Sequence, residues 1–335
     1  MSYKTLALQV TCQSVNSCTT RDEAETVMLQ TIERIEKQIA ASIGLAGRDT
    51  LLVVVPESFL TGFPMAETID EWREKAALDI DGNIYEALGA MVQRQQIYFS
   101  GNAYEQDPFF PELYFQTSFI LGPNGDVLLR YRRLNALHIP TPHDVWELYI
   151  DAYGYDSLFP VVKTNIGNLA CIASEDILYP EVARCLSMRG AELLLHSTSD
   201  ASSPQPTQRS VAKLARAAEN MAYIISANSA GIANSPLPAD SNNGNSIIVD
   251  PKGRVLAEAG YGESMAANAD IDLVALREFR QRPAAANLLA RQRLELYSES
   301  YAKNTIYPPN TLLNHPADRQ HVTRVQQEVI KKMYN

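Results

Sequence analysis

The chain has 335 residues, 46% of them hydrophobic and 20% charged, which is the composition of a globular protein that can bury a sizeable core. Its formal net charge of −10 argues against a nucleic-acid partner, because no basic patch is present to neutralise phosphates. No apolar run reaches the roughly 18 residues of a membrane span, so none is predicted.

The cysteines and histidines predict neither a disulfide framework nor a metal site. The four cysteines, Cys12, Cys18, Cys171 and Cys185, show no Cys-x-x-Cys spacing, and the five histidines form no His-x-His or His-Glu-x-x-His pattern. The first residues lack the apolar region of a signal peptide. We therefore expect a cytoplasmic protein without a metal or another cofactor.

Strand-like apolar runs alternate with helical patterns in the first half of the chain. The continuous run Leu51–Val55 is typical of a strand buried on both faces, and the turn residues Gly122–Gly125 predict a hairpin. In chain order, we expect a strand at 6–10, a helix at 22–42, a strand at 51–55, a helix at 83–96, a strand at 97–103 and a hairpin at 114–133.

The same alternation continues in the second half. We expect a hairpin at 159–173, a helix at 180–190, a strand at 192–196, a helix at 207–222, a strand at 223–227 and a hairpin at 246–257. The helix at 207–222 is predicted to bury a face made of Val211, Leu214, Ala218 and Met221. Beyond residue 285 the tail begins helical and ends in a polar, proline-containing extension.

No internal repeat, low-complexity linker or change in composition marks a domain boundary. Strands mixed with amphipathic helices predict a single α/β domain. Two sheets packed face to face would accommodate this many hairpins and helices.

Six segments, in order along the chain, resemble segments of the nitrilase (carbon–nitrogen hydrolase) superfamily, amidase-like branch. They lie at residues 54–64, 125–133, 166–184, 189–196, 216–231 and 244–253, and the similarity spans roughly residues 5–300. The resemblance implies an α-β-β-α sandwich that pairs as a homodimer or a higher homo-oligomer. It also implies a family domain at residues 1–300 and a C-terminal extension at residues 301–335, which we expect at a subunit interface together with the helix that begins at Pro180.

The resemblance implies acyl transfer by a cysteine as the family's chemistry. A cysteine thiolate attacks a nitrile or amide carbon, a glutamate moves protons, and a lysine stabilises charge on the tetrahedral intermediate. Glu57 follows a buried strand within Val54–Pro64 and matches the family's glutamate. The alternative for a lone glutamate is a surface or helix-start position, which the flanking strand and turn disfavour.

Arg133 matches the position of the family's lysine. A guanidinium keeps the positive charge, but it is planar and effectively never deprotonated. It could pair with Glu57 or hold a substrate carboxylate. A shift of one residue would place Arg132 there instead, and the alternative role is that of a solvated arginine at a strand end.

Ser174 matches the position of the nucleophile. A serine hydroxyl needs a strong base beside it, whereas the family's site is built around a thiol. Cys171 lies three residues upstream, so on a strand its side chain points to the opposite face. We interpret it as a small buried hydrophobic residue rather than a replacement nucleophile.

Four further residues near these positions are candidates for the site. Glu175 and Asp176 directly follow Ser174, and Asp176 is expected to hold the turn by accepting backbone hydrogen bonds. Glu147 is a candidate for a second glutamate near the substrate, in a loop at 135–157 that we expect to cover the pocket mouth. His196 ends a strand near the pocket wall; with Glu147 and Glu175 it is a substrate-binding candidate, although a satisfied structural histidine is the more common role.

Three functions remain open from the sequence. The first is a pseudoenzyme that keeps a pocket for a small amide, nitrile or carbamoyl-type ligand without hydrolysing it, since two of the three catalytic positions are replaced. The second is an amidase-type hydrolase of non-peptide C–N bonds seen as a cysteine-to-serine variant. The third is a hydrolase with a working serine nucleophile and Glu57 as its base.

Overall fold

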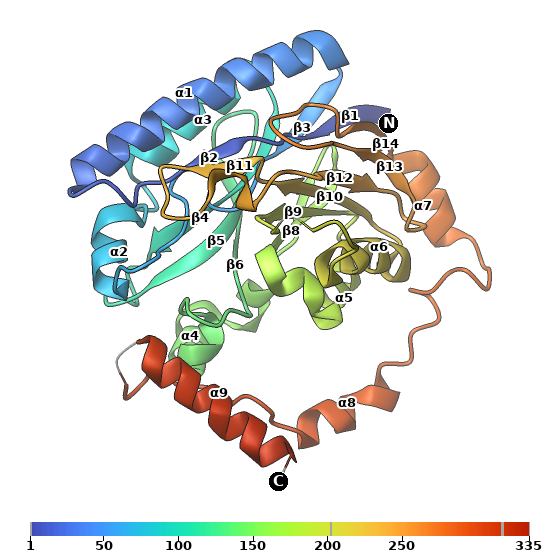
Figure 1. The fold of residues 1–335 in the computed structure, drawn as a ribbon. Helices are drawn as coiled ribbons and strands as arrows, with labels where there is room; N and C mark the ends of the chain where they lie inside the picture. The colour runs from blue at the N-terminus through green and yellow to red at the C-terminus, as the bar shows by residue number, and fades with distance from the viewer. Residues whose placement is uncertain (1, 202, 316–317, 335) are drawn as a thin grey trace.

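The structure is a computed structural model that describes residues 2–201, 203–315 and 318–334 (Figure 1). The parts of the predicted C-terminal extension at residues 316–317 and 335 lie outside the described residues. Within the described ranges, none of the helices is both long enough and apolar enough to span a membrane.

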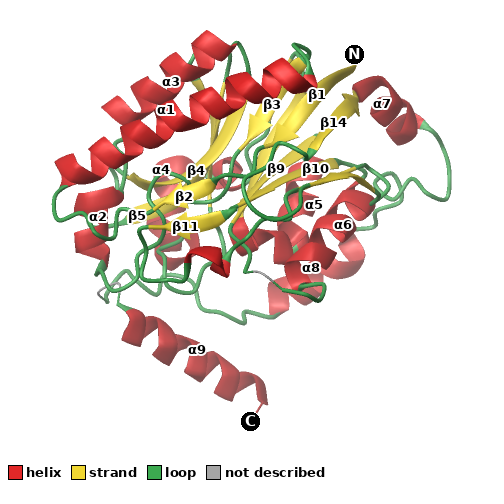
Figure 2. Ribbon diagram, turned by 45° about the horizontal axis from the view of Figure 1, so that its top comes forward, coloured by secondary structure: helices red, strands yellow, loops and turns green. Residues whose placement is uncertain are grey.

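Two six-stranded sheets form the centre of the molecule (Figure 2). The first has the order β14-β1-β3-β4-β5-β6. Its strands are β1 (Ser2–Ala7), β3 (Thr50–Val54), β4 (Tyr98–Gln106), β5 (Tyr114–Leu121), β6 (Val127–Arg132) and β14 (Asn268–Asp272).

The second sheet has the order β13-β12-β10-β9-β8-β7. Its strands are β7 (Val162–Thr164), β8 (Gly167–Ala173), β9 (Leu193–Thr198), β10 (Tyr223–Asn228), β12 (Ile247–Val249) and β13 (Val255–Glu258). A small parallel pair joins β2 (Thr11–Gln13) to β11 (Gly231–Ala233).

Helices cover the outer face of each sheet. α1 (Arg21–Ala46) and α3 (Asn83–Gln95) lie over the first sheet, and α5 (Pro180–Met188) and α6 (Gln208–Asn220) lie over the second (Figure 1). The remaining helices are α2 (Ile69–Ala76), α4 (Trp146–Tyr153), α7 (Leu273–Gln281), α8 (Glu295–Lys303) and α9 (Arg319–Tyr334), with short 3-10 turns at Pro142–Val145, Tyr155–Leu158, Ser174–Leu178 and Ala239–Ser241. The α-β-β-α sandwich predicted from the sequence is thereby confirmed.

Apolar side chains from both sheets fill the space between them. Leu52, Ile120 and Tyr131 of the first sheet belong to the same buried cluster as Ile172 and Leu194 of the second. Because successive side chains of a strand point to opposite faces, each central strand also sends side chains outward to the covering helices. This arrangement explains why the central strands read as continuous apolar runs.

Two predicted elements differ from the structure. The first strand was expected at residues 6–10 but spans Ser2–Ala7, because it pairs with β14, whose polar sequence gives no strand signal. The tail beyond residue 285 begins helical with α8, as expected, but it ends in the helix α9 rather than in a polar extension. The expected boundary at residue 300 falls inside α8, so the chain leaves the sandwich between α7 and α8 (Figure 1).

The buried face of α6 also differs from the prediction. Val211, expected in the core, is 58% exposed, whereas Lys213, Arg216 and Asn220 are buried. Ala212 and Ala217 are also buried, as is Met221 of the predicted face. The inward face therefore combines small apolar side chains with polar ones that hold neighbouring turns and charges, and these polar side chains are part of the candidate site.

Candidate active site

Three strand ends bring Glu57, Arg133 and Ser174 together. β3 and β6 run in the same direction in the first sheet, so Glu57 and Arg133, which follow them, lie at the same edge. Ser174 directly follows β8 of the facing sheet. All three side chains are buried, with exposures of 3%, 7% and 2%.

Gln116 of β5 joins Glu57 to Arg133. Its amide donates to Glu57 Oε1 at 2.7 Å, and its carbonyl oxygen accepts from Arg133 Nη1 at 2.7 Å. Arg133 Nη1 also lies 3.6 Å from Glu57 Oε1. Burial opposes the charge of the guanidinium, but Glu57 and Glu175 outweigh this effect and raise the pKa of Arg133. One oxygen of the Glu57 carboxylate therefore accepts a hydrogen bond from Gln116 and forms a longer ion pair with Arg133.

The backbone at Ser174 turns sharply. Its φ of 48° lies in the left-handed region, which costs a non-glycine residue roughly 1–2 kcal/mol. His196 Nε2 lies 2.8 Å from the Ser174 carbonyl oxygen, and Arg216 donates to the carbonyl oxygens of Ile177 and Leu178 at 3.0 and 2.9 Å. We call the turn Ser174–Leu178 the elbow; these bonds hold it in place.

Asp176 ties the elbow to the loop that follows Arg133. Its buried carboxylate accepts from Tyr131 Oη at 2.6 Å, from the backbone N–H groups of Leu134 and Asn135 at 2.9 and 2.8 Å, and from the Asn135 side chain at 2.8 Å. The expectation that Asp176 holds a turn through backbone amides is thus met, but the amides belong to the other sheet's loop. Burial raises the pKa of Asp176, against the opposing effect of these donors.

His196 is a neutral, fully buried residue that supports the elbow. A carbonyl oxygen can only accept, so Nε2 carries the proton that it donates to Ser174, and Nδ1 accepts from Ser226 Oγ at 2.9 Å. Burial, reinforced by the nearby Lys213 charge, lowers the pKa of the imidazole to about 3. With both nitrogens engaged, His196 positions the elbow and has no free atom for a substrate.

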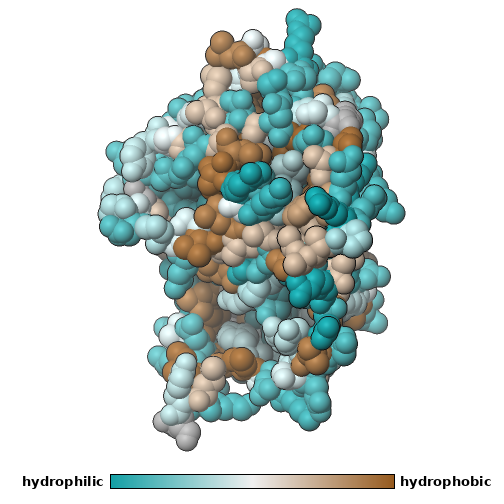
Figure 3. Space-filling model, turned by 90° about the vertical axis from the view of Figure 1, so that its right-hand side faces the viewer, coloured by the Kyte–Doolittle hydropathy of each residue, from teal (hydrophilic) through white to brown (hydrophobic). Residues whose placement is uncertain are grey.

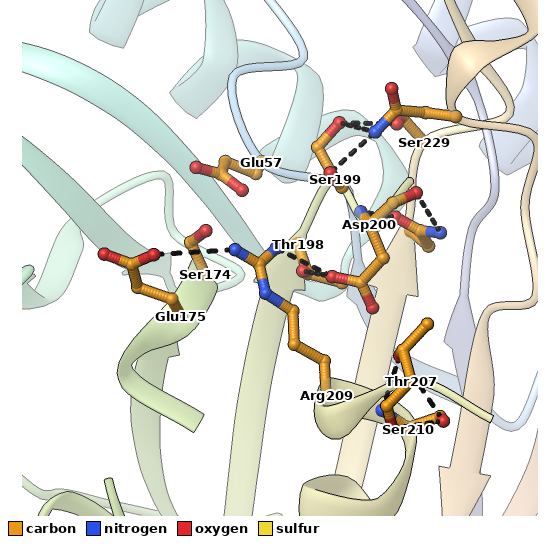
Figure 4. A network of polar contacts seen from close by, with 12 residues as sticks. Glu57, Ser174, Glu175, Thr198, Ser199, Asp200, Thr207, Arg209, Ser210 and Ser229 are labelled. Atoms are coloured by element: carbon orange, nitrogen blue, oxygen red, sulfur yellow. Dashed lines mark hydrogen bonds and ion pairs between the residues drawn. The ribbon is translucent and has the colours of Figure 1, made fainter. Parts of the chain in front are cut away.

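A chain of alternating charges runs from Glu57 to α6. Arg209 reaches across the second sheet's strand ends toward Glu175 and Asp200 (Figure 4). The ion pairs, in order, are Glu57–Arg133 at 3.6 Å, Arg133–Glu175 at 2.7 Å, Glu175–Arg209 at 3.7 Å, Arg209–Asp200 at 2.9 Å and Asp200–Lys213 at 2.7 Å. The three positive and three negative groups cancel, so the site itself carries no net charge.

Only some of the other predicted residues belong to this cluster. Glu175 belongs to it. Glu147 does not: it is exposed on α4, and only its backbone N–H is bonded, to Asn310. The helical turn of α4 points it outward, so we no longer place it near the substrate. Cys171 faces Ser100 between the sheets, 3.7 Å from its hydroxyl, and burial raises the pKa of its thiol to about 12.

A cleft of about 800 Å³ opens beside Glu175. The loop at residues 135–157, predicted to cover the pocket mouth, lines one side of it, α5 lines another, and the tail closes it with Ile306 and Tyr307. Glu175 and Leu178 of the elbow line the cleft, whereas Ser174, Glu57 and Arg133 are not among its lining residues. In the described part of the chain, no group of three or more His, Cys, Asp or Glu side chains is placed to hold a metal ion.

A protein-family model described as carbon–nitrogen hydrolase matches residues 13–281, which is most of the chain. The chain belongs to the carbon–nitrogen hydrolase family. An omega-amidase of Xenopus tropicalis is 27% identical over 259 residues, 77% of this chain and 89% of that protein. A 2-oxoglutaramate amidase of Bacillus subtilis is 28% identical over 240 residues, 69% of this chain and 81% of that protein.

Solved structures share the fold of this carbon–nitrogen hydrolase. A carbon–nitrogen hydrolase from Helicobacter pylori superposes with a TM-score of 0.67 at 20% identity and covers 90% of this chain and 99% of that chain. A Saccharomyces cerevisiae member of the nitrilase superfamily superposes with a TM-score of 0.65 at 21% identity, covering 85% and 95%. The predicted membership of the nitrilase superfamily is confirmed.

Sequence reasoning did not find Gln116, Arg209, Asp200 or Lys213. Gln116 reads as an ordinary strand residue, and Arg209 and Lys213 read as the solvated face of a helix. The spacing of four between Arg209 and Lys213 places both on one helical face, which was the available signal. Their shared partner, Asp200, lies on the loop after β9, and only the fold brings it there.

We predict that His196→Gln flattens the pH dependence of stability. Between pH 6.5 and 3 the unfolded chain protonates this group and the folded chain does not, so wild-type stability falls as the pH falls. From about pH 7 to about pH 5 the group accounts for a loss of about 2 kcal/mol in the free energy of unfolding. Urea unfolding at both pH values measures this loss in the free energy of unfolding. The exposed control His138→Gln should keep the wild-type slope; a wild-type slope in His196→Gln would contradict a neutral His196.

Proposed function

We propose that this carbon–nitrogen hydrolase is an amidase-type enzyme acting on the non-peptide C–N bond of a small amide, nitrile or carbamoyl compound. The observation that carries the proposal is the convergence of Glu57, Arg133 and Ser174, buried, at a strained turn. The relatives named as amidases favour this interpretation over a pseudoenzyme. Their similarity, at 27% and 28% identity, extends over at least two thirds of the chain.

The proposed reaction uses Ser174 as the nucleophile. Its hydroxyl oxygen attacks the amide carbon while Glu57 takes the hydroxyl proton, and the positive charge of Arg133 stabilises the oxyanion that forms. The tetrahedral intermediate collapses, the C–N bond breaks, and Glu57 returns the proton to the leaving nitrogen. Water, deprotonated by Glu57, then attacks the serine ester. The ester C–O bond breaks, the acid is released, and Glu57 returns the proton to the Ser174 oxygen.

Two features make this reaction slow. A serine hydroxyl is a weaker nucleophile than a thiol at neutral pH. The Glu57 oxygen that lies 3.6 Å from Arg133 Nη1 already accepts a hydrogen bond from Gln116, so it must give up this contact before it can take the proton of the Ser174 hydroxyl. Among the described residues, the Ser174 hydroxyl has no hydrogen-bond partner, so its activation depends on rearrangement when substrate binds.

We expect Ser174→Cys to raise amide turnover by roughly two orders of magnitude, because a thiolate attacks without a strong base. Ammonia release from a panel of small amides and ureido compounds measures the change, and intact-protein mass spectrometry reports the acyl adduct. Ser174→Ala is the control and should show neither. Equal, background-level rates for wild type, Ser174→Cys and Ser174→Ala would contradict the proposed function.

Ligand binding without turnover is a second candidate function. It is favoured by the ion pair of Arg133 with Glu57, because a base that is permanently paired with a guanidinium moves protons poorly. On this interpretation the cluster is a recognition site for the same class of small ligand.

The variant Arg133→Lys, made in the Ser174→Cys background, separates the two candidates. If the site is catalytic, the lysine places a compact ammonium, a point charge, beside the oxyanion in place of the planar guanidinium, and turnover rises further, by roughly tenfold. Ammonia release measures this change. If the site only binds, the double variant binds small amides but yields no ammonia.

We also propose that the chain pairs with a second copy through α5, α8 and the C-terminal extension. Tyr301 of α8 donates to Glu181 of α5, which places the two helices side by side. Viewed from the side where the chain leaves α7, hydrophobic side chains gather in a band (Figure 3). Large hydrophobic side chains exposed on α5, α8, α9 and the chain between α7 and α8 are Met188, Leu288, Leu294, Leu296, Tyr297, Tyr301, Ile330, Met333 and Tyr334.

We predict a homodimer or a higher homo-oligomer at micromolar concentration, measured by light scattering coupled to size exclusion. The double change Leu296→Asp with Tyr297→Asp should shift the molar mass toward that of the monomer, because it places charges in an apolar interface. Glu147→Lys, on the exposed face of α4, serves as the control. A wild-type monomer would contradict the pairing.

A further inference from the structure

The charged residues that line the cleft beside Glu175 all carry the same sign. They are Asp144, Glu175 and Glu181, and among the described residues no lysine or arginine lines the cleft. Burial lowers the pKa of the His143 imidazole despite the nearby Asp144, so this residue adds no positive charge near pH 7.

Two of the three carboxylates have no cation beside them. Asp144 accepts from Thr141 and Thr311, and Glu181 accepts from Tyr301, all of which are neutral donors. Within the described ranges, neither carboxylate forms an ion pair, whereas Glu175 is paired with Arg133 and Arg209. The uncompensated charge thus lies in the outer cleft, away from the elbow.

Aromatic rings form much of the remaining wall. They are Trp146, Tyr155, Phe159, Tyr179 and Tyr307. A guanidinium already lies over two of them: Arg189 is 5.7 Å from the centre of the Tyr155 ring and 5.2 Å from that of Phe159. Among the described residues, no cation lies over Trp146, Tyr179 or Tyr307, and an aromatic face attracts a positive group that lies within about 6 Å of the ring centre.

The arginines near the elbow leave no free charge for an anionic ligand. Arg133 is shared between Glu57 and Glu175, and Arg209 between Glu175 and Asp200. A ligand carboxylate would have to displace one of these partners and would also enter a negative cleft. Both effects oppose the binding of a ligand that carries a carboxylate.

We infer that the cleft selects a small amide whose far end carries an ammonium or a guanidinium. The amide C–N bond lies at Ser174, and the cation lies in the outer cleft, between Asp144, Glu181 and the aromatic wall. This inference rests on the proposed function for the amide end. A cleft of about 800 Å³ is within the size range of small-molecule sites.

The test compares three aliphatic amides of the same length, ending in an ammonium, a methyl group or a carboxylate. Calorimetry on the full chain measures their dissociation constants without requiring turnover. We expect the ammonium amide to bind on the order of tenfold more tightly than the methyl amide, and the carboxylate amide to bind most weakly. Because outer-cleft charges are partly exposed, the preference should shrink as salt is raised.

Matched variants locate the effect. Glu181→Gln removes one cleft charge and should reduce the preference for the ammonium amide severalfold without changing the affinity for the methyl amide. Glu147→Gln removes the same charge from the exposed face of α4 and should leave all three affinities unchanged.

Equal binding of the ammonium and methyl amides, tighter binding of the carboxylate amide, or no binding of any amide would overturn the inference. The proposed function is judged separately on the Ser174→Cys variant. If that variant releases ammonia from the methyl amide while no preference for the ammonium amide is seen, the hydrolase proposal stands and only the assignment of the cleft fails.

Discussion

The buried carboxylate of Asp176 connects the two sheets where the candidate site lies. It receives a side-chain bond from Tyr131 of β6 and backbone bonds from Leu134 and Asn135, so the residues on both sides of Arg133 are tied to the elbow that presents Ser174. A buried carboxylate with four donors is stable, whereas one with fewer would be costly. The relative position of Arg133 and Ser174 therefore depends on this one group more than on either strand alone.

The elbow shows how a strained backbone is kept in place by its surroundings. The left-handed conformation at Ser174 is unfavourable by itself, and the residue lacks the freedom of glycine. A neutral His196 donates to the Ser174 carbonyl oxygen, and Arg216 of α6 donates to those of Ile177 and Leu178. A protonated His196 could still donate to Ser174, but its Nδ1 could no longer accept from Ser226, and its charge would lie close to Lys213.

Charge balance distinguishes the inner site from the cleft in front of it. The six ionic groups from Glu57 to Lys213 alternate in sign and cancel, which makes their burial tolerable. The outer cleft keeps unpaired carboxylates beside aromatic rings. In the proposed ligand, the uncharged amide thus lies at the balanced inner site, and the charged end lies in the outer cleft.

Much of the fold could be predicted from the sequence because its signals are local. The buried strand at Leu51–Val55, the hairpin turn at Gly122–Gly125 and the amphipathic pattern of α1 each depend on neighbours within a few residues. β14 could not be predicted, because its polar sequence becomes a strand only by pairing with β1. The buried polar side chains of α6 were not predicted for a similar reason: their partners, Asp200 and the elbow, are distant in sequence.

The sequence by itself determined the sandwich, the family resemblance and the three positions Glu57, Arg133 and Ser174, since each rests on residue type and order along the chain. Only the tertiary structure decided which side chains surround them. It moved Glu147 out of the site, made His196 a support for the elbow, and brought Gln116 and Arg209 into contact with the charged residues. Hydrogen bonds and ion pairs act over a few ångströms in space, and that distance is set by how the two sheets pack rather than by spacing along the chain.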